Sequence, residues 1–212
     1  MIFVTGGTGY LGQRLIPALL SRGHQVRALA RPGSERRLPP GCEAMLGNAL
    51  DAASFASKIA PADTLVQLIG VPHPAPWKAR QFREVDLVAA RASVAAAQEA
   101  GIRHFVYLSV AQSAPVMRAF IEVRAECEAA IRASGIPATF VRPWYVLGPG
   151  HRWPYALIPF YALLERFPPT RDTARRLGLV TLRQTVAALV RAVESPPDGV
   201  RIFDVEEIRR AA

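Results

Sequence analysis

The fold is decided by Val4-Thr5-Gly6-Gly7-Thr8-Gly9-Tyr10-Leu11-Gly12. An apolar, strand-like run precedes this stretch, and apolar residues at helical spacing follow it. In a strand–helix turn, Gly6 permits a sharp bend, Gly9 lets backbone N–H groups approach a phosphate, and Gly12 lets the helix pack on the sheet. The helix N-terminus then faces the phosphate charge. We therefore predict a dinucleotide-binding loop, the alternative being a turn that binds nothing. Its predicted contacts are Gly6, Thr8, Gly9, Tyr10, Leu11 and Gly12.

Strand-like and helix-like segments alternate along the whole chain. The predicted strands are Ile2–Thr5, Gln25–Ala30, Ala44–Leu46, Thr64–Ile69, His104–Ser109, Thr139–Arg142 and Val200–Val205. The predicted helices are Leu11–Arg22, Ala52–Lys58, Arg80–Ala100, Val116–Ser134 and Leu182–Glu194. Three of these helices end at the glycines Gly23, Gly101 and Gly135, and the last begins with a capping-box pattern, Thr181 to Gln184. The alternation predicts one α/β domain over residues 1–212: a doubly wound parallel sheet of the Rossmann type, with helices on both faces.

Residues 144–176 are expected to form a loop and helix insertion on the substrate side of this domain, giving a small C-terminal lobe. Within it, the apolar segment Trp153–Leu164 has three readings: ordinary core, a lid over the pocket, or a surface for peripheral membrane contact. The longest apolar run, Tyr155 to Leu164, is shorter than the roughly 18 residues that a membrane-spanning helix needs. We therefore expect no transmembrane segment.

Arg31 directly follows the second predicted strand, and Ser34, Arg36 and Arg37 lie close after it. At this position an acidic side chain would bind the ribose of NAD, whereas an arginine accepts the 2′-phosphate of NADP. We therefore expect NADP(H) rather than NAD(H), with a solvated loop as the alternative. Asn48 is expected either at the adenine edge or in a simple turn. Further cofactor contacts are predicted where the fourth and sixth strands end, at Ile69, Gly70 and Pro143.

These motifs resemble those of the extended and atypical short-chain dehydrogenase/reductases (SDRs), the NAD(P)-dependent epimerase/dehydratase-like group. Thr5 to Gly12 resembles the TGxxGxxG loop of that group, and Gly47-Asn48-Ala49-Leu50-Asp51 resembles its GDxxD turn with asparagine for the first aspartate. Phe105–Ser109 is similar to its fifth strand, and Arg142-Pro143 with Gly148-Pro149-Gly150 to its RP…GPG segment. The resemblance covers nearly the whole chain and implies a nicotinamide cofactor.

The chain departs from this family at the catalytic helix. The family pattern YxxxK supplies a tyrosine that donates the proton and a lysine that holds the nicotinamide ribose. The corresponding residues here are Phe120 and Arg124. Phenylalanine has no proton to give, although Arg124 can still hydrogen-bond the ribose. The serine or threonine of the family is replaced by Ala111. The usual proton chemistry is therefore not expected.

Other side chains can supply the proton in place of the family's tyrosine, because polar and aromatic residues follow the fourth, fifth and sixth strands. His73, Ser109, Tyr145 and His151 are the candidate catalytic residues. All three tryptophans, Trp77, Trp144 and Trp153, fall in the same loops, which suits a planar or apolar substrate. For each of these residues the alternative is that the side chain packs in the core or is exposed to solvent without touching a substrate.

Three functions are consistent with these features. The first is an NADP(H)-dependent oxidoreductase or isomerase acting on a small hydrophobic carbonyl compound. The second is a non-catalytic NADP(H)-binding regulator or assembly factor, as NmrA-like relatives of the family suggest. The third is a membrane-associated accessory protein. The resemblance also implies that helices 80–100 and 116–134 form a homodimer interface, the alternative being helices that only cover the sheet.

Composition and residue spacing argue against a nucleic-acid-binding protein, a metal site and a disulfide framework. The net charge of +9 comes almost entirely from scattered arginines, since Lys58 and Lys78 are the only lysines, and no nucleic-acid-binding motif accompanies it. We therefore expect no nucleic-acid partner. Cys42 and Cys127 lack metal-ligand spacing, so neither a metal site nor a disulfide framework is expected. The N-terminal residues enter the glycine loop without a leader-like segment, which leads us to expect a cytoplasmic protein.

Overall fold

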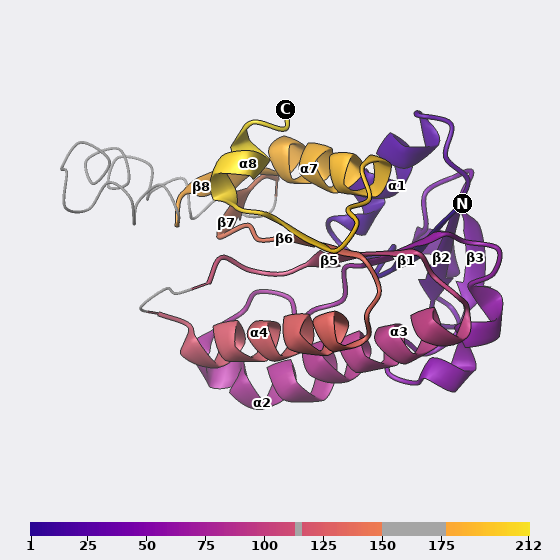
Figure 1. The fold of residues 1–212 in the computed structure, drawn as a ribbon, viewed down its shortest axis with the longest axis horizontal. Helices are drawn as coiled ribbons and strands as arrows, with labels where there is room; N and C mark the ends of the chain where they lie inside the picture. The colour runs from indigo at the N-terminus through magenta and orange to yellow at the C-terminus, as the bar shows by residue number, and fades with distance from the viewer. Residues whose placement is uncertain (113–115, 150–176) are drawn as a thin grey trace.

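A parallel seven-stranded sheet forms the centre of the computed structural model, which describes residues 1–112, 116–149 and 177–212. The strand order is β3-β2-β1-β4-β5-β6-β9, and every neighbouring pair is parallel (Figure 1). The strands are β1 (Ile2–Thr5), β2 (Val26–Ala30), β3 (Glu43–Leu46), β4 (Thr64–Gln67), β5 (His104–Leu108), β6 (Ala138–Val141) and β9 (Val200–Phe203). The predicted doubly wound Rossmann fold is confirmed.

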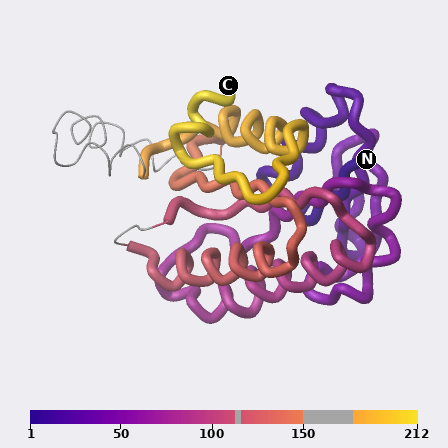
Figure 2. The backbone as a smooth tube through the Cα atoms, in the orientation of Figure 1, coloured from indigo at the N-terminus to yellow at the C-terminus, as the bar shows by residue number. Residues whose placement is uncertain are grey.

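Helices cover both faces of the sheet (Figures 1 and 2). On one face lie α1 (Gly12–Leu20), α7 (Leu182–Glu194) and α8 (Val205–Arg209); on the other lie α2 (Ala79–Gln81), α3 (Val88–Glu99) and α4 (Arg118–Ala133). Each face has its own apolar core, with Leu15 and Leu189 in one cluster and Phe82 and Ile131 in the other. The apolar strands β1, β4, β5 and β6 are buried on both sides, as parallel strands between two helix layers should be.

The predicted helix ends are largely confirmed. Gly23, Gly101 and Gly135 follow α1, α3 and α4 with φ angles of +82°, +68° and +74°, the left-handed backbone that glycine adopts without a steric penalty. The capping box at the start of α7 is present: Thr181 Oγ1 accepts from Gln184 N at 3.1 Å, and Gln184 Oε1 accepts from Thr181 N at 2.8 Å.

Several elements differ from the prediction. The helix predicted over 52–58 is two 3₁₀ turns, Ala52–Ser54 and Ala56–Lys58, the first opened by Asp51, whose side chain accepts from Ala53 N. A π-helical segment, Phe82–Leu87, interrupts the helix predicted over 80–100. The last strand stops at Phe203, because Asp204 and Glu207 form a capping box that begins α8. Further 3₁₀ turns span Glu35–Arg37 and Pro76–Lys78.

A second, two-stranded parallel sheet was not predicted. It pairs β7 (Tyr145–Leu147) with β8 (Leu179–Thr181), and it flanks the segment expected as the substrate-side insertion. Residues 150–176 of that segment, including His151 and Trp153–Leu164, lie outside the described residues.

Candidate functional site

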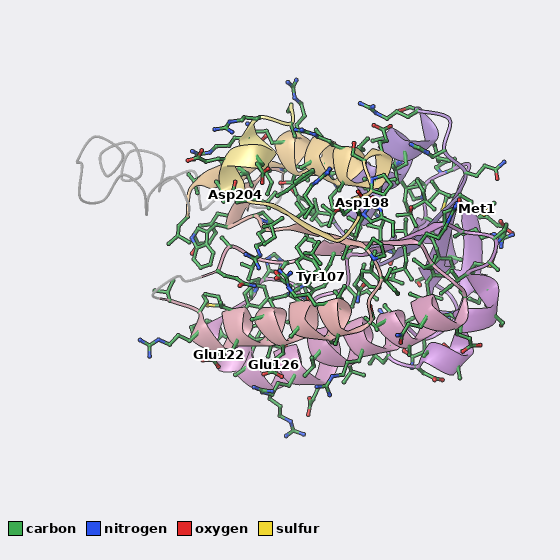
Figure 3. All side chains as sticks on the ribbon, viewed as in Figure 1. Met1, Tyr107, Glu122, Glu126, Asp198 and Asp204 are labelled. Carbon is green, nitrogen blue, oxygen red and sulfur yellow. The ribbon has the colours of Figure 1, made fainter. Side chains whose placement is uncertain are left out.

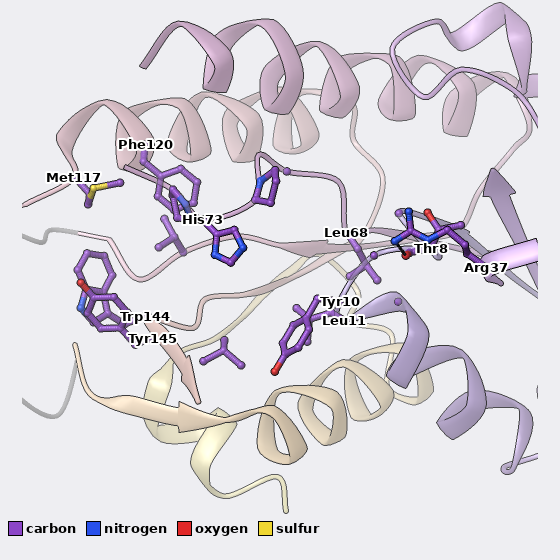
Figure 4. Close-up of a pocket in the computed structure, with 18 of the residues that line it drawn as sticks. Thr8, Tyr10, Leu11, Arg37, Leu68, His73, Met117, Phe120, Trp144 and Tyr145 are labelled. Carbon is purple, nitrogen blue, oxygen red and sulfur yellow. Dashed lines mark hydrogen bonds between the residues drawn. The ribbon is translucent and has the colours of Figure 1, made fainter. Parts of the chain in front are cut away.

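A pocket of about 800 Å³ opens at the carboxyl ends of the central strands (Figure 4). The strand order reverses between β1 and β4, because β1 leads to α1 on one face of the sheet and β4 leads to α2 on the other. Doubly wound sheets bind ligands at this switch point. The described lining residues are Gly6, Thr8, Gly9, Tyr10, Leu11, Gly12, Arg31, Arg37, Leu68, Gly70, Pro72, His73, Pro74, Val110, Met117, Phe120, Trp144, Tyr145 and Val146.

The glycine loop forms one end of the pocket, and all six residues predicted from it line the wall. Gly6 has a φ angle of +79°, and Gly9 N donates to Gly6 O at 3.0 Å, which closes the turn. A Cβ on Gly12 would lie 2.5 Å from Gly6 O and 2.6 Å from Gly7 Cα. The glycines therefore serve the purposes that the sequence indicated, a sharp bend and a close approach of the helix to the loop.

Two arginines lie beside this loop. Arg31 follows β2, and Arg37 ends the next 3₁₀ turn, from which its Nη2 donates to Thr8 O at 3.3 Å. Ser34 Oγ donates to Arg31 O at 2.7 Å, so this hydroxyl stabilises the turn. Both arginines line the pocket, whereas the sequence singled out Arg31 alone as a contact. Its described lining contains no other arginine and no lysine, aspartate or glutamate.

The other end of the pocket is apolar and aromatic. Phe120 lies there, packed on Phe82 with ring centroids 5.0 Å apart, and the rings of Trp144 and Tyr145 lie 5.3 Å apart. Burial raises the pKa of the Tyr145 phenol. Figure 4 shows His73 in the same space, reached from the loop after β4. Two of the candidate catalytic residues, His73 and Tyr145, are therefore brought together with the residue at the family's tyrosine position.

Arg124 lies behind this wall and outside the pocket lining. Its side chain is only 7% exposed and forms an ion pair with Asp86, Nη2 to Oδ1 at 2.9 Å. Its Nη1 donates to Leu108 O at 2.8 Å and to the Tyr107 hydroxyl at 3.0 Å. Figure 3 shows Tyr107 between the sheet and α4. Burial raises the pKa of Asp86, an effect that the Arg124 guanidinium opposes. Arg124 thus ties α4 to the ends of the strands, and Phe120 covers it, with the guanidinium carbon 5.1 Å from the ring centroid.

This ion pair supports the pocket wall at Gly70. A Cβ on Gly70 would overlap Arg124 Nη2 and lie 2.7 Å from Asp86 Oδ1. Val71 N donates to the same Asp86 oxygen at 3.1 Å. Asp86 belongs to the π-helical segment, so the local widening of the helix places the carboxylate that holds this turn.

Four other candidate residues also lie outside the described lining. Ser109 is buried and donates to Glu128 Oε1 at 2.6 Å, and Arg142 Nε donates to the same oxygen at 2.9 Å. Asn48 Oδ1 accepts from Leu50 N at 3.1 Å, which is the turn expected as the alternative for this residue. Ile69 and Pro143 follow β4 and β6 close to the pocket without lining it.

The lining also contains apolar residues that the sequence motifs do not single out: Leu68, Pro72, Pro74, Val110, Met117 and Val146. Leu68 directly follows β4 and Val110 lies two residues after β5, so for these two the position after a strand is the available signal. No helix in the described ranges is long and apolar enough to cross a membrane.

Comparisons with known proteins identify the family of this chain. The profile of the NAD(P)H-binding family matches residues 6–155. Ceramide reductase from Caulobacter vibrioides is 26% identical over 215 residues, which cover 99% of this chain and 65% of that protein. A 3-beta-hydroxysteroid dehydrogenase from Mycolicibacterium neoaurum is 31% identical, over 50% of this chain and 31% of its own. The chain thus spans less than two thirds of the length of these relatives.

Solved structures share the fold. The Bordetella bronchiseptica enzyme WbmH, in complex with NAD⁺, superposes with a TM-score of 0.70 at 20% identity, over 99% of this chain and 78% of that one. A UDP-galactose 4-epimerase superposes with a TM-score of 0.69. The resemblance to the epimerase/dehydratase-like SDRs is confirmed, and the chain belongs to the NAD(P)H-binding family.

Proposed function

We propose that this chain is an NADP(H)-dependent oxidoreductase of the atypical SDR type, acting on a small hydrophobic carbonyl compound. The observation that carries the proposal is one continuous pocket that joins the glycine loop and two arginines to an apolar, aromatic end. At that end the described lining holds no carboxylate, lysine or arginine side chain. A permanently charged substrate group would lose its hydration there with none of these side chains to pair with, so an uncharged substrate fits best.

The names of the relatives support an enzyme of this class. They are a ceramide reductase and a 3-beta-hydroxysteroid dehydrogenase, both named for oxidation or reduction of an apolar molecule. The comparisons give no support to a non-catalytic regulator.

The preference for NADP(H) rests on Arg31 and Arg37. Guanidinium groups present several N–H donors in a fixed plane, which suits a phosphate better than a ribose hydroxyl. Arg37 is held toward the loop by its hydrogen bond to Thr8 O. No carboxylate in the described lining is available to bind a free 2′-hydroxyl.

The Tyr–Lys pair of the family has no counterpart in the proposed chemistry. Phe120 lines the pocket without a transferable proton, and Arg124 is committed to Asp86, Tyr107 and Leu108. When bound, the reduced nicotinamide supplies a hydride. The chain's own residues must hold the substrate, exclude water and provide the proton, for which Ser109 is poorly placed because its hydroxyl already donates to Glu128.

Calorimetric titration with NADPH and NADH tests the cofactor assignment. We expect NADPH to bind more tightly, and the Gly12→Ala variant, whose loop is overpacked, to lose most of this affinity. Turnover is then followed by nicotinamide absorbance with three uncharged probes: 9,10-phenanthrenequinone, menadione and 4-nitroacetophenone. Tight NADPH binding with no oxidation by any probe would contradict the catalytic part of the proposal, and an absence of dinucleotide binding would contradict all of it.

A further inference from the structure

Two residues in the pocket have an unusual backbone. His73 has a φ angle of +49° and Met117 a φ angle of +59°, and within the described ranges no other non-glycine residue has a positive φ. Both line the apolar end of the pocket. The left-handed region is unfavourable for side chains with a Cβ, although histidine tolerates it better than most residues. Such conformations concentrate where function requires a side chain to point in one direction.

The segment that leads to His73 is held by two hydrogen bonds. Lys78 Nζ donates to Pro72 O at 2.7 Å, and Val71 N donates to Asp86 Oδ1 at 3.1 Å. Pro72 and Pro74 flank the histidine and restrict the backbone. Figure 4 shows the imidazole projecting toward the middle of the pocket, between Phe120 and Tyr10 in that view.

Few groups at this end of the pocket carry a transferable proton. Among its described lining residues they are His73 and Tyr145, since Phe120, Met117 and the valines have none and the indole N–H of Trp144 is not an acid near neutral pH. Burial raises the pKa of Tyr145, which makes its phenol a weaker acid. Tyr10 belongs to the glycine loop, and its hydroxyl packs on Gly148. Imidazole groups exchange protons near neutral pH.

We propose that His73 is the proton donor to the carbonyl oxygen of the substrate, at a site where the family uses the tyrosine that Phe120 replaces. This inference rests on the proposed function. As the hydride of the reduced nicotinamide forms a C–H bond at the carbonyl carbon, the π-electron pair of the C=O bond moves to oxygen. That oxygen takes the proton of the His73 imidazolium. The products are the alcohol, the oxidised nicotinamide and neutral His73, which regains its proton from water.

The first test compares His73→Asn with Tyr145→Phe in the full chain, using NADPH and 9,10-phenanthrenequinone. Asparagine tolerates the left-handed backbone but transfers no proton, so it isolates the acid function. We expect kcat to fall about 100-fold or more in His73→Asn, with the dissociation constant for NADPH unchanged. In Tyr145→Phe we expect a change below about 10-fold.

The pH profile gives a second readout, because a purely structural role of His73 would not move it. An acid must be protonated to act, and imidazole groups lose their proton near neutral pH, so the rate of carbonyl reduction by the wild-type protein should fall as pH rises. This fall in rate with rising pH should be absent in His73→Asn. The other titratable groups in the described pocket lining are Tyr10, Tyr145, Arg31 and Arg37, and Lys78 binds the carbonyl of the neighbouring Pro72. The fall in rate should persist in Tyr145→Phe.

Thermal unfolding of His73→Gly tests the backbone argument. Glycine relieves the steric cost of the positive φ, so we expect Tm to be unchanged or raised while kcat falls as in His73→Asn. Wild-type-like turnover by His73→Asn, or a Tm several degrees lower in His73→Gly, would overturn this inference and leave the proposed function standing. If the wild-type protein binds NADPH but reduces none of the three probes, the proposed function fails, and this inference fails with it.

Discussion

The two edges of the central sheet differ in how they are built. At the carboxyl edge the strands lead into a glycine loop, a strained histidine and an open pocket. At the amino edge polar side chains bind one another: His104 is 2% exposed and hydrogen-bonds Thr139 Oγ1 at 3.0 Å, and Arg103 pairs with Asp63. Because all strands are parallel, every carboxyl end reaches one edge, so binding groups gather there. Residues at the amino edge are therefore expected to stabilise the fold and not to bind the cofactor.

The largest effect is expected from the Asp86–Arg124 pair behind the carboxyl edge. Asp86→Ala leaves a buried guanidinium without its carboxylate and should lower the free energy of unfolding by about 3–5 kcal/mol, which corresponds to a Tm lower by about 10 °C. Affinity for NADPH should also fall, because the Gly70–Val71 turn loses its anchor.

An exposed ion pair provides the control for this variant. Arg83 and Glu126 pair at 2.8 Å with side chains 56% and 39% exposed, so Glu126→Ala should cost less than about 1 kcal/mol. Equal losses of stability in the two variants, measured by urea unfolding, would show that burial of the Asp86–Arg124 pair has no special importance.

Gly12→Ala should give the next largest effect. The added Cβ meets backbone atoms that cannot rotate away, so we expect a loss of about 2–3 kcal/mol together with at least about a 10-fold loss of NADPH affinity. Gly199→Ala, just before β9 at the amino edge, is the matched control, because its Cβ would meet nothing within 4 Å. If Gly12→Ala bound NADPH normally, the glycine loop would not be the phosphate site.

At the amino edge, pH should change stability without changing cofactor affinity. Burial, with a smaller contribution from Arg201, lowers the pKa of His104 from 6.5 to about 4. The unfolded chain therefore binds this proton at higher pH than the folded chain, so the stability is fully present above pH 6.5 and is lost as pH falls toward 4. Between pH 7 and pH 5 we expect a loss of about 2 kcal/mol from this group.

The His104→Gln variant should lack this part of the pH dependence. Its dissociation constant for NADPH at pH 7 should match that of the wild-type protein. If the variant bound NADPH much more weakly, the proposed separation of the two edges would be wrong.

The smallest effect is expected at the rim of the pocket. Arg31→Asp should weaken NADPH binding about 10-fold and improve NADH binding, since a carboxylate repels the 2′-phosphate and can accept from a ribose hydroxyl. Arg36→Asp is the control, because Arg36 lies in the neighbouring 3₁₀ turn but not in the pocket lining. Similar losses in both variants would indicate a general charge effect and not a 2′-phosphate contact.

The glycine-loop end of the pocket could be predicted because it is local in sequence. One short stretch supplies the strand end, the turn and the helix start, and each glycine has a backbone reason for its position. Arg31, which the sequence places by its distance from the loop, also lines the pocket, and its contact with a 2′-phosphate stays a prediction. The seven strands of the main sheet were also found, because apolar runs bounded by glycine are local signals.

The other end could not be predicted to the same depth, because it depends on contacts between distant residues. The pairing of β7 with β8 joins segments of three residues each, too short to give a pattern. Arg124 has the charge that a cofactor contact needs, but Asp86, 38 residues away in the sequence, draws the guanidinium to the far side of Phe120. The positive φ of Met117 has no sequence signal at all.

The close packing of Gly70 on Arg124 constrains the order in which this pocket can change. A side chain at position 70 would collide with a guanidinium that Asp86, Leu108 and Tyr107 hold in place. Replacing Gly70 first overpacks the wall, whereas replacing Arg124 first leaves the buried Asp86 carboxylate without its partner, and its Oδ1 would still lie 2.7 Å from the new Cβ. Natural or directed evolution of this wall should therefore be path-dependent, and libraries that vary both positions together should recover solutions that single-site scans miss.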